Sequence, residues 1–401
     1  MQTPMQTVCI LGSTGSIGAN TLDVIARQPE RYRVFALTAH SRVDIMVAQC
    51  MQFRPRYAVM ASQAHARELE SALKVAGAVT EVLAGALALD WVAAHEEVST
   101  VMAAIVGAAG LSACIAAALA GKRLLLANKE ALVVGGALFM DAVKRGGATL
   151  LPIDSEHSAI FQSLPENPTT WASVIDKIIL TASGGPFRTR DPATLSQVTP
   201  QEACAHPNWV MGRKISVDSA TMMNKALEVI EAKFLFDVAP QTIQVLIHPQ
   251  SVIHSMVQFV DHSIVAQLGT PDMRAPIAYG LAWPERHVCG ASAIDFSTIS
   301  ALTFETFDDP GHQKRFPGLK LAREALDAVA GTTAVLNAAN EVAVAAFLEE
   351  SIRFDQIHAV NLGTLERFIP TAPSSLPDLL AIDLEARACA SAMVRALQAG
   401  Y

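Results

Sequence analysis

The first 150 residues alternate short apolar runs with helical patterns, and this alternation limits the possible folds more than any other feature. Strands separated by helices are typical of βαβ units, whose strands form a parallel sheet. We therefore predict an α/β domain over 1–153. Its predicted strands are Thr7–Leu11, Tyr32–Thr38, Tyr57–Met60, Val101–Val106, Arg123–Ala127 and Thr149–Ile153. Its predicted helices are Ala19–Arg27, Val43–Phe53, Ala64–Val75, Leu111–Ala120 and Ala131–Arg145.

The pattern changes after residue 153, and we predict three further segments there. Residues 154–283 combine strands with one long helix, 284–311 form an irregular linker, and 312–401 form a helical bundle. The predicted strands are Lys177–Ala182, Gln244–Ile247, Val252–Phe259 and Ser263–Leu268, and the helix is Ala220–Phe236. The predicted bundle helices are Leu319–Ala330, Thr332–Glu350, Asp355–Arg367 and Leu379–Gln398.

Composition excludes several classes of protein. Hydrophobic residues make up 51% of the 401 residues and charged residues 17%, so large buried cores are expected and extensive disorder is not. The net charge of −8 argues against a general nucleic-acid binder. Six scattered cysteines without a C-x-x-C pair indicate a reduced, cytoplasmic chain. The first residues lack a basic segment followed by an apolar one, so we expect no signal or transit peptide.

One uncharged stretch, Val101–Gly121, has about the length of a membrane span. It is dominated by alanine and glycine, and Gly107 and Gly110 interrupt it where a strand would turn into a helix. We interpret it as a buried strand–turn–helix rather than a membrane span.

A glycine motif, G-x-x-G-x-x-G, joins the first strand to the first helix at Gly12, Gly15 and Gly18. Glycines at this position let the backbone approach a pyrophosphate, which then lies at the helix N-terminus. A glycine-rich turn without a ligand is the alternative. The motif predicts dinucleotide binding.

Polar residues after two other strands bear on the cofactor. The second strand ends in His40, Ser41 and Arg42, without the acidic residue that usually binds the ribose of NAD. Ser41 and Arg42 favour a 2′-phosphate and hence NADP, although Arg42 also fits an ordinary surface position. Ala127-Asn128-Lys129-Glu130 follows a buried strand, where polar residues face a ligand crevice or simply begin a helix.

Asp154 and Glu156 lie two residues apart directly after an apolar strand. If the segment is extended, both side chains point to the same side and meet at the strand end. Crowded carboxylates repel each other, and a divalent cation that prefers oxygen ligands relieves this. An exposed acidic loop is the alternative reading of this motif.

A second polar cluster follows residue 180. Ser183-Gly184-Gly185-Pro186 offers a hydroxyl and free N–H groups to an anion. Ser219, Asn224 and Lys225 lie at the start of the predicted helix and suit a phosphate, with Glu228 or Glu231 on nearly the same face for a metal. Spacing does not choose between the two glutamates, and a salt-bridged surface helix is the alternative.

The loop His206-Pro207-Asn208-Trp209-Val210-Met211-Gly212 combines a tryptophan and a methionine between proline and glycine. Such loops often close over a substrate and exclude water. Packing of Trp209 into the core is an equal alternative.

These motifs, together with H-P-Q-S at 248–251 and A-A-N-E at 338–341, closely resemble 1-deoxy-D-xylulose 5-phosphate reductoisomerase. The resemblance extends in order over the whole chain. It implies an N-terminal Rossmann-type NADP-binding domain, a central α+β catalytic domain and a C-terminal α-helical bundle. It also implies NADPH-dependent conversion of 1-deoxy-D-xylulose 5-phosphate (DXP) to 2-C-methyl-D-erythritol 4-phosphate, in the non-mevalonate pathway to isoprenoids, by a homodimer.

The resemblance also implies roles for individual residues. It favours Glu228 over Glu231 as the third ligand, beside Asp154 and Glu156, of a cation such as Mg²⁺, Mn²⁺ or Co²⁺. The implied substrate contacts are Lys129, Ser155, Glu156, Ser183, His206, Trp209, Ser219, Asn224, Lys225 and Glu228. Catalysis is assigned to Lys129, Asp154, Glu156 and Glu228. The implied NADPH contacts are Thr14, Gly15, Ser16, Ile17, Asn128, Glu130 and Gly212. Some members carry Gly-Lys-Asn at His40, Ser41 and Arg42, so Arg42 is expected to replace the lysine charge.

Two other functions are compatible with the glycine motif. A semialdehyde dehydrogenase-like enzyme needs a nucleophilic cysteine, and Cys114 and Cys204 are the candidates. A non-catalytic NADP sensor would bind the cofactor without metal dependence or turnover. Asn337, Asn340 and Glu341 in the bundle are expected to be structural.

Overall fold

The computed structural model describes residues 5–209 and 211–399, and the chain forms two compact units. Unit 1 contains the chain up to Ala131, Phe139–Ser158 and Asp272–Ser292. Unit 2 contains Leu132–Leu138, Ala159–Pro271 and the chain from Ala293. Residues 1–4, on which the expectation about a targeting peptide partly rests, lie outside the described residues.

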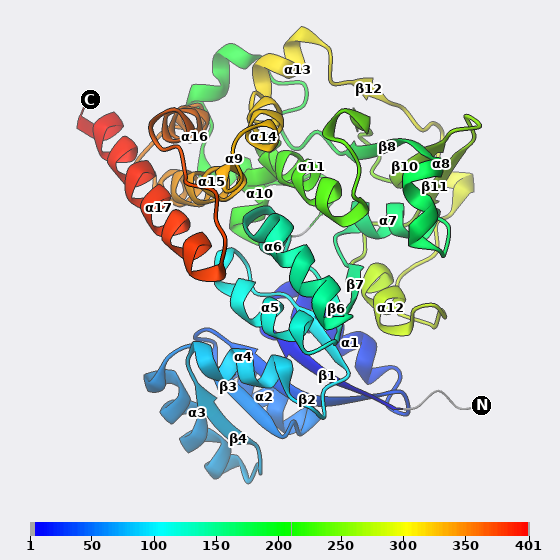
Figure 1. Cartoon of the computed structure of the whole chain (residues 1–401), viewed down its shortest axis with the longest axis vertical. Coiled ribbons are helices and arrows are strands. Elements are labelled where there is room, and N and C mark those ends of the chain that lie inside the picture. Colours follow the sequence, from blue (N-terminus) through cyan, green and yellow to red (C-terminus); the bar gives the residue numbers. More distant parts are fainter. Residues whose placement is uncertain (1–4, 210, 400–401) are drawn as a thin grey trace. The chain divides into compact units, whose positions relative to one another are not determined.

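Unit 1 is built on a seven-stranded parallel sheet with the strand order β4-β3-β2-β1-β5-β6-β7 (Figure 1). The chain adds strands outward from β1 in one direction and then in the other. Ligands of such sheets bind beyond the carboxyl ends of the strands where the order reverses. This topology confirms the predicted Rossmann-type domain. The strands are β1 (Gln6–Leu11), β2 (Tyr32–Ala39), β3 (Tyr57–Met60), β4 (Glu81–Ala84), β5 (Thr100–Ala103), β6 (Arg123–Leu126) and β7 (Thr149–Pro152).

Helices join these strands, and the prediction missed one strand–helix pair. The joining helices are α1 (Ser16–Ala26), α2 (Val43–Phe53), α3 (Gln63–Ala76), α4 (Ala86–Ala94), α5 (Leu111–Leu119) and α6 (Glu130–Gly146). A later helix, α12 (Arg274–Ala282), also belongs to unit 1 and packs against α1. The missed pair is β4 and α4. β4 lies at the sheet edge and none of its residues is fully buried, so it lacks the apolar signal of the inner strands.

The uncharged stretch Val101–Gly121 forms most of β5, a 3-10 turn and α5, as expected. Among the described residues, none of the helices combines the length and the apolar character that a membrane crossing requires.

Unit 2 contains a five-stranded mixed sheet with the order β11-β10-β8-β9-β12. The strands are β8 (Ile175–Ala182), β9 (Ile243–Ile247), β10 (Ile253–Phe259), β11 (Ile264–Leu268) and β12 (Glu305–Thr306). β8 and β9 pair in parallel, whereas β10 pairs antiparallel with β8 and β11, and β12 pairs antiparallel with β9. Leu227 and Ile230 pack with Ile178 and Val257 of the sheet in one apolar core. This core holds the helix of residues 223–236 against the sheet, so its position is set by burial rather than by surface charges.

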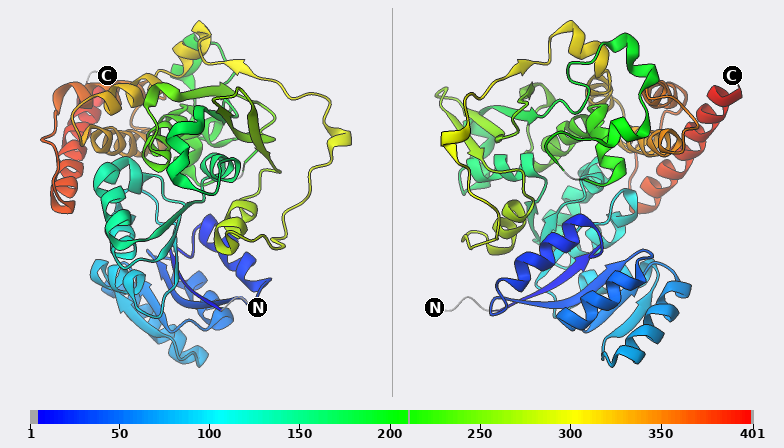
Figure 2. Two further views of the ribbon diagram at one scale, coloured as in Figure 1. Left: turned by 45° about the vertical axis from the view of Figure 1, so that its right-hand side comes forward. Right: turned by 180° about the vertical axis from the view of Figure 1, so that it is seen from behind.

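The helices of unit 2 include the C-terminal bundle, whose helices lie side by side in Figure 2. The helices are α7 (Ser155–Ser163, which begins in unit 1), α8 (Trp171–Val174), α9 (Pro200–Cys204), α10 (Arg213–Ala220), α11 (Met223–Phe236), α13 (Pro310–Arg315), α14 (Gly318–Asp327), α15 (Thr332–Leu348), α16 (Gln356–Arg367) and α17 (Leu376–Ala399). The helical C-terminal region is thus confirmed. The predicted irregular linker 284–311 contains β12, and α13 begins at its end.

The single helix predicted over Ala220–Phe236 is wrong in one respect. The chain forms α10 and α11, and Met222 between them has a left-handed backbone with φ +60°. A non-glycine residue in this conformation interrupts the helical hydrogen bonds. Ser219 therefore lies in the last turn of α10, not near a helix start.

Candidate active site

The glycine motif in unit 1 forms the turn between β1 and α1. Gly12 has φ +82°, and a Cβ there would lie 2.6 Å from the carbonyl oxygen of Ala104. At Gly18 a Cβ would lie 2.4 Å from the Cα of Ser13. At Gly15, by contrast, it would meet only Gly12 O, at 3.5 Å. Packing therefore requires the first and third glycines, whereas the second leaves open space on its exposed side.

The start of α1 suits an anion. The helix begins at Ser16 without a side-chain cap and without an acidic residue in its first turn. The backbone N–H groups of such a turn, together with the helix dipole, favour negative charge. Thr14, Gly15, Ser16 and Ile17 are exposed or half-buried here, as a cofactor contact requires.

His40, Ser41 and Arg42 are all exposed and directly follow β2, the neighbour of β1. The Nε of Arg42 lies 3.8 Å from a carboxylate oxygen of Asp44, and both side chains are largely exposed. Surface pairs of this kind contribute little to stability. Arg42 therefore places an exposed positive charge beyond the carboxyl end of the strand.

Asn128 and Lys129, between β6 and α6, and Glu130, at the start of α6, are all buried. The Asn128 side chain donates to Gly107 O at 3.1 Å and accepts from the N–H of Ala131 at 3.3 Å. It thereby fixes the start of α6, where Glu130 is the first residue. Asn128 and Glu130 thus begin a helix, as the alternative interpretation of this motif expected.

Asp154 and Glu156 do not lie on an extended segment, which corrects the geometric basis of their prediction. α7 begins at Ser155, directly after Asp154. The carboxylate of Asp154 accepts from the Glu156 N–H at 3.4 Å, and its carbonyl accepts from the Ser158 N–H at 2.8 Å, as an N-cap does. Carboxylate oxygens of Asp154 and Glu156 still lie within 4.8 Å of each other. The helix start replaces the strand as the reason why they converge.

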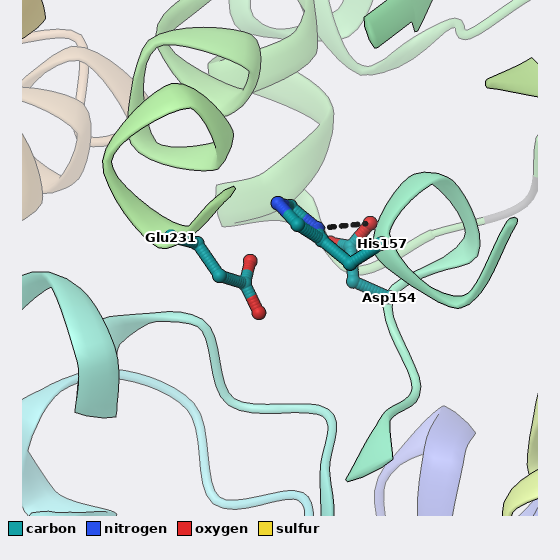
Figure 3. Close-up of side chains that lie close together, drawn as sticks. All are labelled: Asp154, His157 and Glu231. Carbon is teal, nitrogen blue, oxygen red and sulfur yellow. Dashed lines mark ion pairs between the residues drawn. The ribbon is translucent and has the colours of Figure 1, made fainter. Parts of the chain in front are cut away.

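Asp154 is held ionised by its neighbours. Lys129 Nζ lies 2.6 Å from one carboxylate oxygen of Asp154, and His157 Nδ1 lies 3.5 Å from the other. Figure 3 shows the pair of Asp154 and His157, together with Glu231 of α11. Burial raises the pKa of Asp154, but Lys129 and His157 outweigh it and hold the pKa well below its usual range. Ser155 donates to the Glu156 carboxylate at 2.6 Å. The prediction gave His157 no role, although it belongs to the D-S-E-H motif.

In unit 2 the Ser183-Gly184-Gly185 turn follows β8 and contacts the loop that contains His206. Gly184 and Gly185 both have positive φ, a conformation that glycine adopts readily, and the anion-binding turn stays a prediction. His206 Nδ1 accepts from the N–H groups of Asn208 and Trp209, so its Nε2 carries the proton and donates to Ser183 Oγ at 3.0 Å. Ser183 Oγ also accepts from the Gly185 N–H. With two bonds accepted, Ser183 Oγ still has its own O–H to donate.

Asn224 and Lys225 lie in the first turn of α11, and both side chains donate to the Glu228 carboxylate. Lys225 and Glu228 are buried, whereas Ser219 and Asn224 are half-buried. These four residues all belong to unit 2, and the fold brings them to one junction of α10 and α11. Glu231 is also fully buried.

Trp209 is half-buried, and its ring lies 6.2 Å from that of His254 on β10. It is therefore neither in the core nor a free surface side chain. Gly212, at the end of the loop, is exposed and precedes α10. Val210, inside the loop, lies outside the described residues.

Of the two candidate cysteines, Cys114 does not support a thiol nucleophile. Cys114 is buried, and burial raises the pKa of its thiol to about 12. The Cys204 thiol donates to the carbonyl oxygen of Arg213 at 3.9 Å. With a pKa of about 12, the Cys114 thiol is almost entirely protonated at neutral pH.

Comparison with known proteins decides the family. Models described as 1-deoxy-D-xylulose 5-phosphate reductoisomerase, its C-terminal domain and a further DXP reductoisomerase C-terminal domain match residues 8–136, 150–236 and 268–389. The chain belongs to the 1-deoxy-D-xylulose 5-phosphate reductoisomerase family. Proteins of this name from Cupriavidus metallidurans and Stutzerimonas stutzeri are 56% and 57% identical to it. These matches cover 98% and 96% of this chain and 99% and 97% of the two proteins.

Solved structures of family members have the same fold. The Zymomonas mobilis enzyme in complex with NADPH has a TM-score of 0.90 at 47% identity, over 98% of this chain and 99% of that chain. A reductoisomerase in complex with NADPH, fosmidomycin and magnesium has a TM-score of 0.94 at 45% identity, with the same coverage. The resemblance inferred from the motifs is confirmed.

Proposed function

We propose that this chain reduces and rearranges DXP to 2-C-methyl-D-erythritol 4-phosphate with NADPH and a divalent cation. The observation that carries the proposal is identity of more than half, over nearly the full length, to enzymes named for this substrate. Fold alone does not determine function, so the site residues must also suit the chemistry.

The glycine turn suits NADPH. Packing within the protein does not require a glycine at Gly15, so the open space beside it is available to a ligand. The uncapped start of α1 offers N–H groups to a pyrophosphate. Thr14, Ser16 and Ile17 belong to the same turn. Asn128, Glu130 and Gly212 are assigned to the cofactor by the family motifs. His40, Ser41 and Arg42, where this chain departs from some members, are assigned to the 2′-phosphate by their place after β2 and the charge of Arg42. NADPH supplies the hydride.

The carboxylates of Asp154, Glu156 and Glu228 suit a hard divalent cation such as Mg²⁺, Mn²⁺ or Co²⁺. All three offer carboxylate oxygens, and Asp154 and Glu228 each bond to a buried lysine of their own unit. A carboxylate already ionised at neutral pH needs no proton loss before it binds metal. When bound, the cation supplies Lewis-acid polarisation of the substrate oxygens.

The remaining residues bind and orient the substrate. Ser183 has its O–H to donate, and with Ser219, Asn224, Lys225 and His206 it forms the proposed phosphate subsite. Lys129 and Ser155 contact the carbonyl and hydroxyl end, where the lysine ammonium stabilises developing negative charge. Trp209 covers the carbon skeleton and excludes water. Phosphate binding energy is thus available for orientation, because the phosphate is remote from the reacting bonds.

Organisation and location belong to the same proposal. We retain the domain limits 1–153, 154–283, 284–311 and 312–401, and a cytoplasmic homodimer that acts on a small sugar phosphate. All six cysteines are free, which is consistent with a reducing compartment.

One assay tests the function. NADPH oxidation is followed at fixed enzyme with DXP, and with and without Mg²⁺ or Mn²⁺ after treatment with a chelator. Turnover that requires both DXP and metal is expected, and thiol alkylation should leave it intact. Cofactor binding without turnover would favour the NADP sensor instead.

A further inference from the structure

Asn340, in the A-A-N-E motif of α15, makes a buried polar contact with α10. Its Nδ2 donates to Oδ1 of Asp218 at 2.8 Å, and both side chains are almost completely buried. The other oxygen of Asp218 bonds to Lys214 Nζ at 2.8 Å. The Asp218 carboxylate is thus shared between a helix of the C-terminal bundle and the first turn of α10.

The orientation of the Asn340 amide is fixed from its other side. Its Oδ1 accepts from Asn361 Nδ2 of α16 at 3.1 Å, so its nitrogen must face Asp218. Asn361 is also fully buried. A buried carboxylate that loses such a donor carries a large desolvation cost, so this chain of bonds specifies one position for α10.

The last turn of α10 supports two parts of the proposed phosphate subsite. Asp218 directly precedes Ser219. The S-G-G-P turn packs against the same point, because a Cβ at Gly185 would lie 2.7 Å from the carbonyl oxygen of Ser219. A shift of this turn would therefore change the distance between Ser183 and Ser219.

We propose that Asn340 is a positioning residue for the substrate phosphate. By holding Asp218, its amide keeps Ser219 and the Ser183 turn at the spacing that a phosphate requires, although Asn340 itself touches no substrate. The C-terminal bundle thereby sets substrate affinity. This inference rests on the proposed function, since it takes the phosphate subsite from it. Misplacement of a supported group by about 1 Å is enough to impair a site.

Asn340→Asp is the sharpest test. It preserves side-chain size and the oxygen that accepts from Asn361, but it replaces the donor to Asp218 with a second carboxylate. Asn340→Ala introduces no charge and serves if the first variant does not fold. Asn337→Ala is the matched control, because Asn337 is equally buried in α15 and its amide donates to Glu341 of the same helix at 3.0 Å.

In Asn340→Asp we expect the KM for DXP to rise about tenfold, as for the loss of roughly 1.4 kcal/mol of binding. The kcat should change by less than about threefold on the scale of a single hydrogen bond, and the KM for NADPH should not change. Asn337→Ala should keep the wild-type KM for DXP even if its Tm falls. An unchanged KM for DXP in both Asn340 variants, or equal rises for DXP and NADPH, would overturn the proposal.

Calorimetry of DXP binding separates this inference from the proposed function. Wild-type protein that binds DXP without turning it over contradicts the function, whereas weaker binding by Asn340→Asp than by Asn337→Ala still supports the positioning role. Wild-type protein that does not bind DXP contradicts both.

Discussion

Lys129 and Asp154 follow two neighbouring strands of the parallel sheet and form a largely buried ion pair, with Nζ 2.6 Å from Oδ2. Asp154 also accepts from the backbone of α7 and contacts His157. The carboxylate is therefore ionised and fixed in position by unit 1 alone. This arrangement makes Lys129 important for the charge state of Asp154 as well as for the substrate.

Lys129→Met should destabilise the protein at neutral pH in metal-free buffer by about 3 kcal/mol, because it leaves a buried carboxylate without its cation. The depressed pKa of Asp154 contributes stability above the unfolded-state value of about 3.9, and that stability is lost as pH falls through the folded-state pKa. The difference between wild type and variant should therefore narrow below about pH 4. Urea unfolding at several pH values measures it.

The double variant Lys129→Met, Asp154→Asn is the control for this pair. Removing both charges should recover part of the lost stability at neutral pH, because no unpaired carboxylate remains buried. If the loss of unfolding free energy in the double variant equals the sum of the losses in the two single variants, the ion pair does not couple the two residues.

Glu228→Gln should lower kcat/KM by about 100-fold or more while NADPH affinity is retained, since the amide has one oxygen and no charge for the cation. Glu231→Gln is the matched control, because Glu231 is equally buried one turn further along α11. Steady-state rates at saturating Mg²⁺ compare the two. An active Glu228→Gln beside an inactive Glu231→Gln would reverse the assignment of the ligand.

Much of the fold follows from sequence pattern because inner strands and amphipathic helices have distinct periodicities. β3 and α2 have the predicted bounds. β4 was missed because an edge strand needs no apolar run. The break at Met222 was also missed, since nothing in the local pattern of Ala220–Phe236 signals a left-handed residue.

For the candidate site, the sequence indicated residues more successfully than it indicated their local geometry. The motifs identified Asp154 and Glu156 correctly as neighbours, but for the wrong geometric reason, because α7 begins at Ser155 and the segment is not extended. Spacing along one helix does not distinguish Glu228 from Glu231 as the third metal ligand, and the family resemblance is what favours Glu228. The Asn340–Asp218 bond joins residues 122 positions apart, and no local pattern can predict such a contact.

Gly15→Ala should fold normally and bind NADPH at least about tenfold more weakly. Gly15 has an ordinary extended backbone, and its new methyl group would make only an ordinary contact, so any loss must come from the ligand. Thermal unfolding and NADPH fluorescence titration separate the two effects. Gly12→Ala is the contrasting variant and should lose stability, because its Cβ would clash with Ala104 at positive φ. Unchanged NADPH affinity in Gly15→Ala would contradict the proposed cofactor turn.

Arg42→Ala should weaken NADPH binding about tenfold and leave NADH binding nearly unchanged, because only NADPH carries the 2′-phosphate that the guanidinium is proposed to bind. The exposed pair with Asp44 contributes little to stability, so the variant should unfold at nearly the wild-type temperature. Arg33→Ala is the matched control, since Arg33 is an equally exposed arginine of β2 that pairs with Glu97 instead. The KM values for both cofactors, measured at low and high salt, give the comparison. Equal losses for NADPH and NADH would remove the 2′-phosphate role from Arg42.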